Sequence, residues 1–147
     1  MRVFFLAMQL LFLQVEQTPE EHEIGLMGVE TMSDSEGMLF VFPTSKLQSF
    51  WSYGCLISLD VGFLDENLIL CEITHLAADP YWKKHPLIHT QEDLFKALRQ
   101  NTSSYSLAIS KESYPYVIEL PSGWFKRHKI DIGSKLYRTD TISYFYP

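Results

Sequence analysis

The sequence predicts a mainly β fold (β-rich α+β), a small β-barrel or sandwich with two or three short helices, in one domain over residues 1–147. Three observations predict it. Aromatic residues make up 14% of the chain, and their side chains favour the half-buried surface of a sheet. Apolar runs of strand length recur at short spacing, with turn signals between them. Helix-start signals are few, so we expect few helices beside the many strands.

The composition favours a globular protein and argues against one class of partner. Hydrophobic residues make up 46% of the 147 residues and charged residues 20%, a balance typical of folded domains. The formal net charge is -6, whereas a nucleic-acid partner requires a basic face that neutralises phosphates. The basic run 126–129 (KRHK) is too short to reverse this, and we interpret it as a solvated helix face. We therefore expect no nucleic-acid partner.

The N-terminal segment is almost wholly apolar from Val3 to Leu13. It is too short for a transmembrane helix, so we expect no integral membrane span. We interpret it as one or two strands, over residues 2–8 and 10–16, in a cytoplasmic protein. An export signal, or membrane association through this apolar N-terminus, is the alternative.

The next elements follow from local signals. Thr18, Pro19 and Glu21 form a capping-box pattern, which predicts a helix from Pro19 to about Met27 with Ile24 and Met27 as its core contacts. Residues 34–37 predict a turn, and residues 38–42 (MLFVF) predict a strand that is buried on both faces and ends at Pro43.

The middle of the chain predicts two further strands and a hairpin. Residues 50–53 and 56–64 are strand-like, with Asp60 and Gly62 interrupting the second run. The turn signal Asp65-Glu66-Asn67 then predicts a hairpin whose return strand covers residues 68–75.

The second half combines helices and strands. Thr90 can cap a helix that runs to about Arg99, inside a segment over residues 81–113 that we interpret as an insertion. After this helix we expect a polar loop at residues 101–104 and strands at 105–109 and 116–120. A third helix at 122–128 and a turn at 133–134 should follow, and then strands at 135–138 and 141–146.

Four motifs, in order, carry a resemblance to a known family. They are TPEE at 18–21 with GLMG at 25–28; EGMLFVF at 36–42; FW at 50–51 with LD at 59–60 and FL at 63–64; and YVIEL at 116–120 with Gly123 and IG at 132–133. The set, from about Leu11 to Tyr137, resembles the domain of unknown function 192 family (DUF192). The resemblance implies a compact, mainly β fold with short helices, and no established reaction.

The chain departs from the family pattern at two places. Val29 stands where the family usually has Arg, and residues Ser52 to Cys55 (SYGC) replace the family's Met, a variable residue, Asn and Thr. The resemblance made Arg, Asn and Thr the most plausible polar site groups. Their absence implies either a lost ligand chemistry or a different ligand.

We take Trp51, Tyr53, Asp60 and Glu119 as the candidate binding residues. Strand alternation places Trp51 and Tyr53 on one side, where with Asp60 they could form an aromatic-lined cleft for a small polar ligand or a protein partner. The alternative is that both rings fill the core and that Asp60 bonds to backbone at a strand kink.

We expect a non-catalytic binding or interaction domain rather than an enzyme, and assign no catalytic residue. A hydrolase-like enzyme is the alternative, with Asp60 and Glu119 as an acid/base pair or Cys55 with His75. A homo-oligomer that assembles through the apolar N-terminal strand is another.

We assign no metal site and no cofactor. The spacing of His75, His85 and His89, with Asp79, does not fit a usual zinc pattern. The sequence contains no glycine-rich phosphate loop or dinucleotide fingerprint. Cys55 and Cys71 form no CxxC pattern, and we interpret them as buried free thiols.

Overall fold

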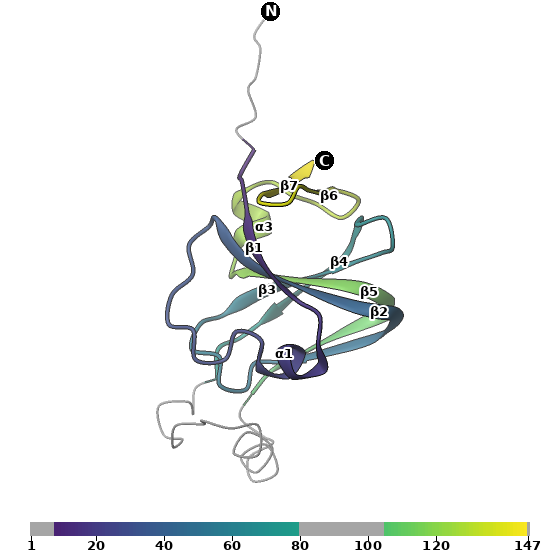
Figure 1. Cartoon of the computed structure of the whole chain (residues 1–147). Coiled ribbons are helices and arrows are strands. Elements are labelled where there is room, and N and C mark those ends of the chain that lie inside the picture. Colours follow the sequence, from purple (N-terminus) through teal and green to yellow (C-terminus); the bar gives the residue numbers. More distant parts are fainter. Residues whose placement is uncertain (1–7, 80–104, 147) are drawn as a thin grey trace, which may run out of the picture.

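The fold is mainly β, as the sequence predicts, in a computed structural model that describes residues 8–79 and 105–146 (Figure 1). The large sheet has five strands in the order β1-β2-β5-β3-β4. β1 runs parallel to β2, and the other neighbours are antiparallel. The strands are β1 (Phe12–Glu16), β2 (Glu36–Trp51), β3 (Leu59–Leu64), β4 (Leu70–Leu76) and β5 (Leu107–Pro121).

Strands β2 and β5 are each longer than predicted. The runs predicted as separate strands, 38–42 with 50–53 and 105–109 with 116–120, are joined in the structure. The pairing passes from Val41 opposite Tyr116 to Lys46 opposite Tyr114, so Pro43 and Pro115 both lie in a bulge. Proline lacks the N–H that a regular ladder requires, and a bulge is where a sheet tolerates it. The prediction that Pro43 ends the strand was therefore wrong.

A hairpin of β6 (Lys135–Arg138) and β7 (Ser143–Tyr146) lies at one end of the large sheet (Figure 1). Isolated bridges connect it to both outer strands, from Ser143 to Leu11 and from Lys135 to Ile69. The two sheets do not merge into a continuous barrel in the described part of the chain. The hairpin instead holds the two outer strands together at this end.

Both faces of the large sheet are buried, because alternate residues of its central strands enter two different cores. One core lies toward the hairpin and the short helix α3 (Trp124–Arg127). The other lies toward the helix α1 (Pro19–Ile24) and includes Met38, Phe40, Val61 and Val117. We call these the hairpin face and the α1 face.

Gly62 explains how α3 packs against the hairpin face. A Cβ atom at this position would lie 2.9 Å from side-chain atoms of Ile118, Leu70 and Phe125. The missing side chain thus leaves room for the Phe125 ring. β3 passes through Asp60 and Gly62 without a break, so the expected interruption was wrong.

Helix α1 begins with the predicted capping box and ends three residues earlier than predicted. The Glu21 carboxylate accepts the Thr18 N–H at 2.9 Å, and the Glu21 N–H donates to Thr18 Oγ1 at 3.2 Å. Gly25 ends the helix at a φ of 48°, a conformation that favours glycine. Ile24 is 53% exposed, and the core contact that it was expected to make comes from the buried Leu26.

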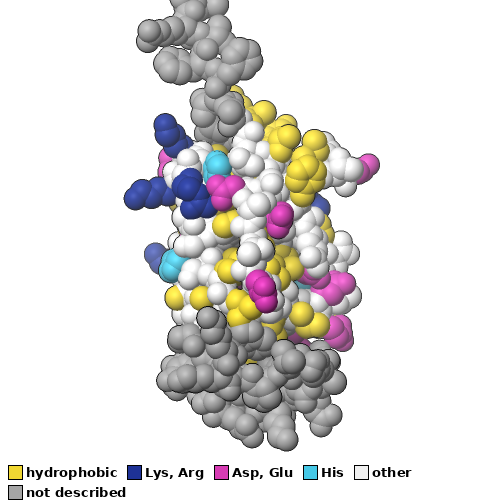
Figure 2. Space-filling model, turned by 90° about the vertical axis from the view of Figure 1, so that its left-hand side faces the viewer, with side chains coloured by type: hydrophobic (Ala, Val, Ile, Leu, Met, Phe, Trp, Pro, Cys, Tyr) yellow, Lys and Arg dark blue, Asp and Glu magenta, His cyan; other side chains and the backbone are white. Residues whose placement is uncertain are grey.

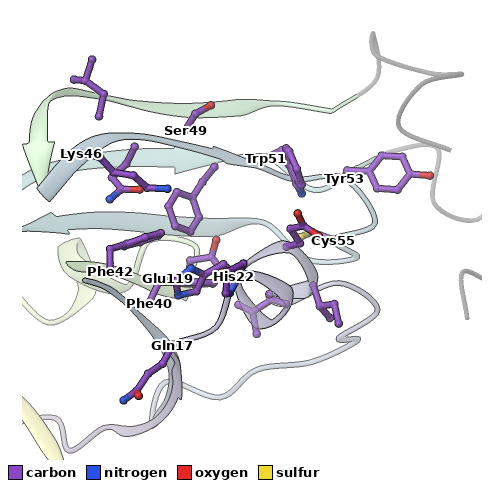
Figure 3. Close-up of a pocket in the computed structure, with 18 of the residues that line it drawn as sticks. Gln17, His22, Phe40, Phe42, Lys46, Ser49, Trp51, Tyr53, Cys55 and Glu119 are labelled. Atoms are coloured by element: carbon purple, nitrogen blue, oxygen red, sulfur yellow. The ribbon is translucent and has the colours of Figure 1, made fainter. Parts of the chain in front are cut away.

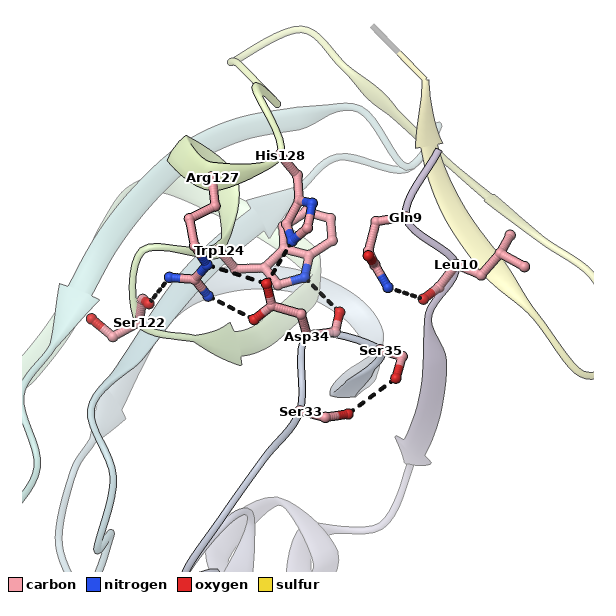
Figure 4. Close-up of polar contacts among 9 residues, drawn as sticks. All are labelled: Gln9, Leu10, Ser33, Asp34, Ser35, Ser122, Trp124, Arg127 and His128. Carbon is pink, nitrogen blue, oxygen red and sulfur yellow. Dashed lines mark hydrogen bonds and ion pairs between the residues drawn. The ribbon is translucent and has the colours of Figure 1, made fainter. Parts of the chain in front are cut away.

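The loop before β2 is fastened to α3 by Asp34 (Figure 4). Its carboxylate pairs with Arg127 at 2.7 Å and with His128 at 2.8 Å, and its carbonyl accepts the Trp124 indole N–H at 2.8 Å. The basic run 126–129, predicted as a solvated face, therefore uses two of its residues to hold this loop. On the face seen in Figure 2, most of the Lys and Arg side chains gather at the upper left, whereas acidic and hydrophobic side chains are spread over the rest of the described surface, the upper right included.

Other local predictions have mixed outcomes. The 65–67 turn is confirmed, since Asp65 Oδ1 accepts the N–H groups of Asn67 at 2.9 Å and Ile69 at 3.0 Å. The third helix is shorter than 122–128. Three predicted elements lie wholly or mostly outside the described residues: the helix at 90–99, the loop at 101–104 and the strand at 2–8. The last part of the predicted insertion, residues 107–113, belongs to β5. In the described ranges, no helix has the length and apolar character to cross a membrane.

Candidate functional site

A pocket of about 640 Å³ opens on the α1 face of the sheet (Figure 3). α1 and the turn after it form one wall, and residues 40–51 of β2 form the other. Tyr53 and Cys55 line one end, and Glu119 of β5 reaches the pocket from the middle of the sheet. In Figure 3, Phe42 and Lys46 lie on one side of Glu119, and Trp51, Cys55 and Tyr53 on the other.

Aromatic rings form much of the pocket wall. Phe40 and Phe50 meet edge to face with ring centroids 4.9 Å apart, and Phe42 and Phe50 do so at 6.3 Å. The bulges of β2 make this possible, because they bend the strand and bring Phe50 back toward Phe40, ten residues earlier in the chain. The result is a rigid apolar surface beside a hollow.

His22 continues this wall from α1. Its ring centroid lies 4.3 Å from that of Phe42. His22 Nε2 lies 2.9 Å from the carbonyl oxygen of Glu16, which can only accept, so Nε2 carries a proton and donates. In the neutral ring Nδ1 is then a hydrogen-bond acceptor.

Glu119 contributes a buried carboxyl to the pocket. The residue is 4% exposed and lies opposite Met38 and Val61 in the central ladder. Burial alone raises the pKa of Glu119 to about 8, because its carboxyl has lost water and no hydrogen bond from the described residues compensates the charge. At neutral pH the carboxyl is therefore mostly protonated, and it can both donate and accept one hydrogen bond.

Cys55 lines the same pocket as an unreactive thiol. The residue is 5% exposed and forms no disulfide. Burial, together with the negative charges of Glu119 and Asp79, raises its pKa to about 12. A thiolate is the nucleophilic form of cysteine, so this environment opposes a nucleophilic role near neutral pH.

The segment that departs from the family pattern forms a tight turn beside the pocket. Asp79 Oδ2 accepts the Gly54 N–H at 3.1 Å, and the Asp79 N–H donates to the Cys55 carbonyl at 2.9 Å. Ser52 Oγ accepts the Ser106 N–H at 2.9 Å. These bonds fix the backbone of Tyr53 and Cys55 at one end of the pocket, so Asp79 has a structural role. In Figure 3 the Tyr53 ring points away from Glu119. The described His, Cys, Asp and Glu residues form no group that could hold a metal ion.

The structure brings three of the four candidate binding residues to one pocket. Trp51, Tyr53 and Glu119 line it, and Asp60 does not. Asp60 pairs with Leu120 of the hairpin-face core, whereas Glu119 pairs with Val61 of the α1-face core. Paired residues share a face, so Asp60 and Glu119 point to opposite sides of the sheet and cannot act as an acid/base pair.

The alternative pair of Cys55 and His75 is also separated. His75 pairs with Asp60 in the ladder, its Nδ1 lying 3.5 Å from the Asp60 carboxylate and 3.4 Å from Ser122 Oγ. It therefore lies on the side opposite the pocket that Cys55 lines. Both contacts share one ring nitrogen, which does not correspond to the relay of a Ser-His-Asp triad.

Several pocket residues were missed by the sequence reasoning. These are Phe42, Phe50, His22 and Lys46, whose Nζ lies 4.5 Å from the centre of the Phe42 ring. The apolar run at 38–42 predicts a strand buried on both faces, but it carries no signal for which face has a hollow. The even spacing of Phe40, Phe42 and Phe50, which strand alternation places on one side, could have indicated the aromatic wall.

Comparisons with known proteins fit this fold. The DUF192 family model, described as "Uncharacterized ACR", matches residues 6–137. No curated protein is detectably similar to the chain. A crystal structure from Sinorhizobium meliloti 1021, described as a candidate transcription regulator, shares 23% identity over 85% of this chain and 79% of its own, with a TM-score of 0.63. A protein of unknown function from Novosphingobium aromaticivorans DSM 12444 shares 22% identity over 84% of this chain and 71% of its own, also with a TM-score of 0.63. At these identities the two structures establish a common fold.

Proposed function

The chain belongs to the DUF192 family, whose description assigns no activity, and from its own pocket we propose that it is a non-catalytic binding domain for a small ligand. The ligand is expected to be largely apolar and to carry one polar group. The observation that carries the proposal is the aromatic pocket on the α1 face, with the buried Glu119 among its lining residues.

The size and lining of the pocket support this proposal. A volume of about 640 Å³ is within the range of known small-molecule sites, roughly 300–1,000 Å³. Such sites combine apolar walls with a few polar groups that fix orientation. Here the walls are Phe40, Phe42, Phe50 and Trp51, and the buried polar residues Glu119 and Gln48 are also among the lining residues.

The chemistry of the lining favours binding over catalysis. The buried Cys55 thiol is protonated near neutral pH, and Glu119 has no second carboxylate from Asp60 beside it. A general acid needs a base or nucleophile on the same substrate, and neither of the pairs considered from the sequence supplies one. The protein is therefore proposed to hold its ligand without transforming it.

A binding screen tests this proposal. We expect some small aromatic or heteroaromatic compounds to raise the melting temperature and to give a measurable Kd by isothermal titration calorimetry. Trp51→Ala should weaken their binding by about tenfold, the equivalent of about 1.4 kcal/mol. Tyr146→Ala, at an exposed aromatic residue of β7, is the matched control and should leave the Kd unchanged. Binding that is unaffected in a folded Trp51→Ala variant, or no binder in the screen, would contradict the proposal.

A second proposal concerns assembly. β1 is an outer strand of the large sheet, and three apolar side chains at or just before it, Met8, Leu10 and Phe12, are 43–58% exposed. Exposed outer strands can pair with another chain. We propose a homo-oligomer formed through this strand, to be tested by light scattering before and after deletion of residues 1–8. A monomer in both cases would contradict it.

A further inference from the structure

We propose that the polar group of the ligand is an ammonium that forms an ion pair with Glu119, while the aromatic walls hold the apolar remainder. This inference rests on the binding function proposed above and specifies its ligand class as small aromatic or arylalkyl amines. Three independent features of the pocket support it: a carboxyl to which no described residue donates a hydrogen bond, the surrounding rings, and the position of the positive charges.

The first feature is the carboxyl of Glu119. It lies at the centre of the sheet, where β5 is hydrogen-bonded to β2 on one side and to β3 on the other, so its backbone is fixed. Among the described residues, no donor forms a hydrogen bond to the carboxyl, and the residue is 4% exposed. Burying a carboxyl without a partner is costly, and a donor supplied by a ligand would recover part of that cost.

The second feature is the set of rings beside the carboxyl. Glu119 lies opposite Met38, and Phe40 is two residues further along β2, on the same face. Diagonal neighbours of this kind are within reach of an aromatic side chain. The edge-to-face packing of Phe40 with Phe50 extends this aromatic surface. Ring faces attract cations, so an ammonium in the pocket would gain from the rings as well as from the carboxylate.

The third feature is the position of positive charge. Among the described residues, the other ionisable side chains that line the pocket are His22, Glu23, Lys46, Tyr53 and Cys55. Lys46 is exposed, with its ammonium over Phe42, and His22 directs its Nε2–H at the Glu16 carbonyl. The described lining residues include no arginine, and Asp79, which is hydrogen-bonded to the turn that carries Cys55, adds negative charge. Within the part of the chain that the structure describes, an anionic ligand would therefore find no buried cation beside Glu119.

Proton release is a distinctive consequence. In the empty pocket the carboxyl is mostly protonated near neutral pH, since burial raises the pKa of Glu119 to about 8. Pairing with an ammonium stabilises the carboxylate, so the Glu119 proton passes to solvent as the ion pair forms. Binding of an amine should release close to one proton, and binding of a neutral ligand should release none.

The test compares three probes of similar shape: 2-phenylethylamine, 2-phenylethanol and phenylacetate. Isothermal titration calorimetry near neutral pH, in two buffers of different ionisation enthalpy, measures both Kd and proton release. We expect the amine to bind at least about tenfold more tightly than the alcohol, phenylacetate to bind most weakly, and only the amine to release a proton. In Glu119→Gln the amine preference and the proton release should both disappear, while the alcohol still binds.

Failures of the two proposals are distinguishable. Equal affinity for amine and alcohol, or an amine preference that survives in Glu119→Gln, would overturn the ammonium inference; if Trp51→Ala still weakens both probes, the binding pocket stands. No binding of any probe at millimolar concentration would also overturn the ammonium inference, and the wider screen then decides the binding function. If Glu119→Gln does not fold, the pH dependence of amine binding and the proton release of the wild type still decide the question.

Discussion

Asp34 and Arg127 form a two-pronged ion pair between segments 93 residues apart in the chain. Arg127 Nη2 donates to Asp34 Oδ1 at 2.7 Å, and Arg127 Nε donates to Asp34 Oδ2 at 3.2 Å. The pair joins the loop before β2 to α3, and His128 adds a third contact at 2.8 Å. Its geometry makes it stronger than a single surface contact, although partial exposure screens it.

Replacement of Asp34 by Asn should lower the free energy of unfolding by on the order of 1 kcal/mol, measured by urea denaturation. Hydrogen bonds from Arg127, and then from His128, hold the pKa of Asp34 below its usual value. The Asp34 carboxylate therefore contributes fully to stability above the usual pKa of aspartate. This contribution is lost as the pH falls through the lowered pKa of Asp34. The stability difference between wild type and Asp34→Asn should shrink in strong acid. Asp140→Asn, in an exposed turn, is the control, and an equal effect there would contradict the role of Asp34.

Glu119→Gln should change the pH dependence of stability in the opposite sense. The folded protein holds the Glu119 proton to a pKa of about 8, whereas the unfolded chain loses it near the usual value. Between these two values the folded state binds more protons, so wild-type stability should fall as the pH rises. Glu119→Gln should flatten that slope and be the more stable protein at about pH 9. Urea unfolding at several pH values measures both, and parallel curves for the two proteins would count against a buried, protonated carboxyl.

Gly62→Ala should destabilise the fold by about 1–3 kcal/mol, because the added methyl group meets three side chains of the hairpin-face core at 2.9 Å. Phe125→Leu removes one of those neighbours. The double variant should therefore lose less stability than the sum of the two single variants. Thermal or urea unfolding of the four proteins measures the difference. Simple additivity would show that Gly62 does not make room for Phe125.

The two cysteines should differ in reactivity. Cys55 is fully enclosed, with its pKa raised to about 12, while Cys71 is half-buried and donates its thiol hydrogen to the Ile69 carbonyl at 3.3 Å. In the native protein, iodoacetamide at about pH 8 should alkylate Cys71 several times faster than Cys55, as measured by peptide mass spectrometry. In denaturant the two rates should converge. Native labelling of Cys55 at the denatured rate would contradict its burial.

Local sequence signals predicted those parts of the fold that depend on near neighbours. The capping box of Thr18 and Glu21, the Asp65 turn and the strand at 135–138 all follow from residues a few positions apart. The continuity of β2 and β5 could not be predicted from such local signals, because it depends on Pro43 and Pro115 sharing one bulge between strands that are far apart in the sequence. Each proline alone indicates a strand end.

The candidate site was predicted in part, for the same reason. Trp51, Tyr53 and Glu119 were identified from their residue types, but the position of Asp60 depends on the register between β3 and β5. A shift of one residue would have placed Asp60 on the pocket side. The sequence contains no signal for that register, nor for the packing of α1 that places His22 against Phe42.

The position of β5 has a consequence for synthesis. It is the last strand of the large sheet to leave the ribosome, yet it lies between β2 and β3. Until residue 121 has emerged, those two early strands have no common neighbour, and their apolar side chains stay unburied. A nascent chain stalled before β5 should thus be digested quickly by protease and should recruit chaperones, whereas one stalled well beyond it should resist.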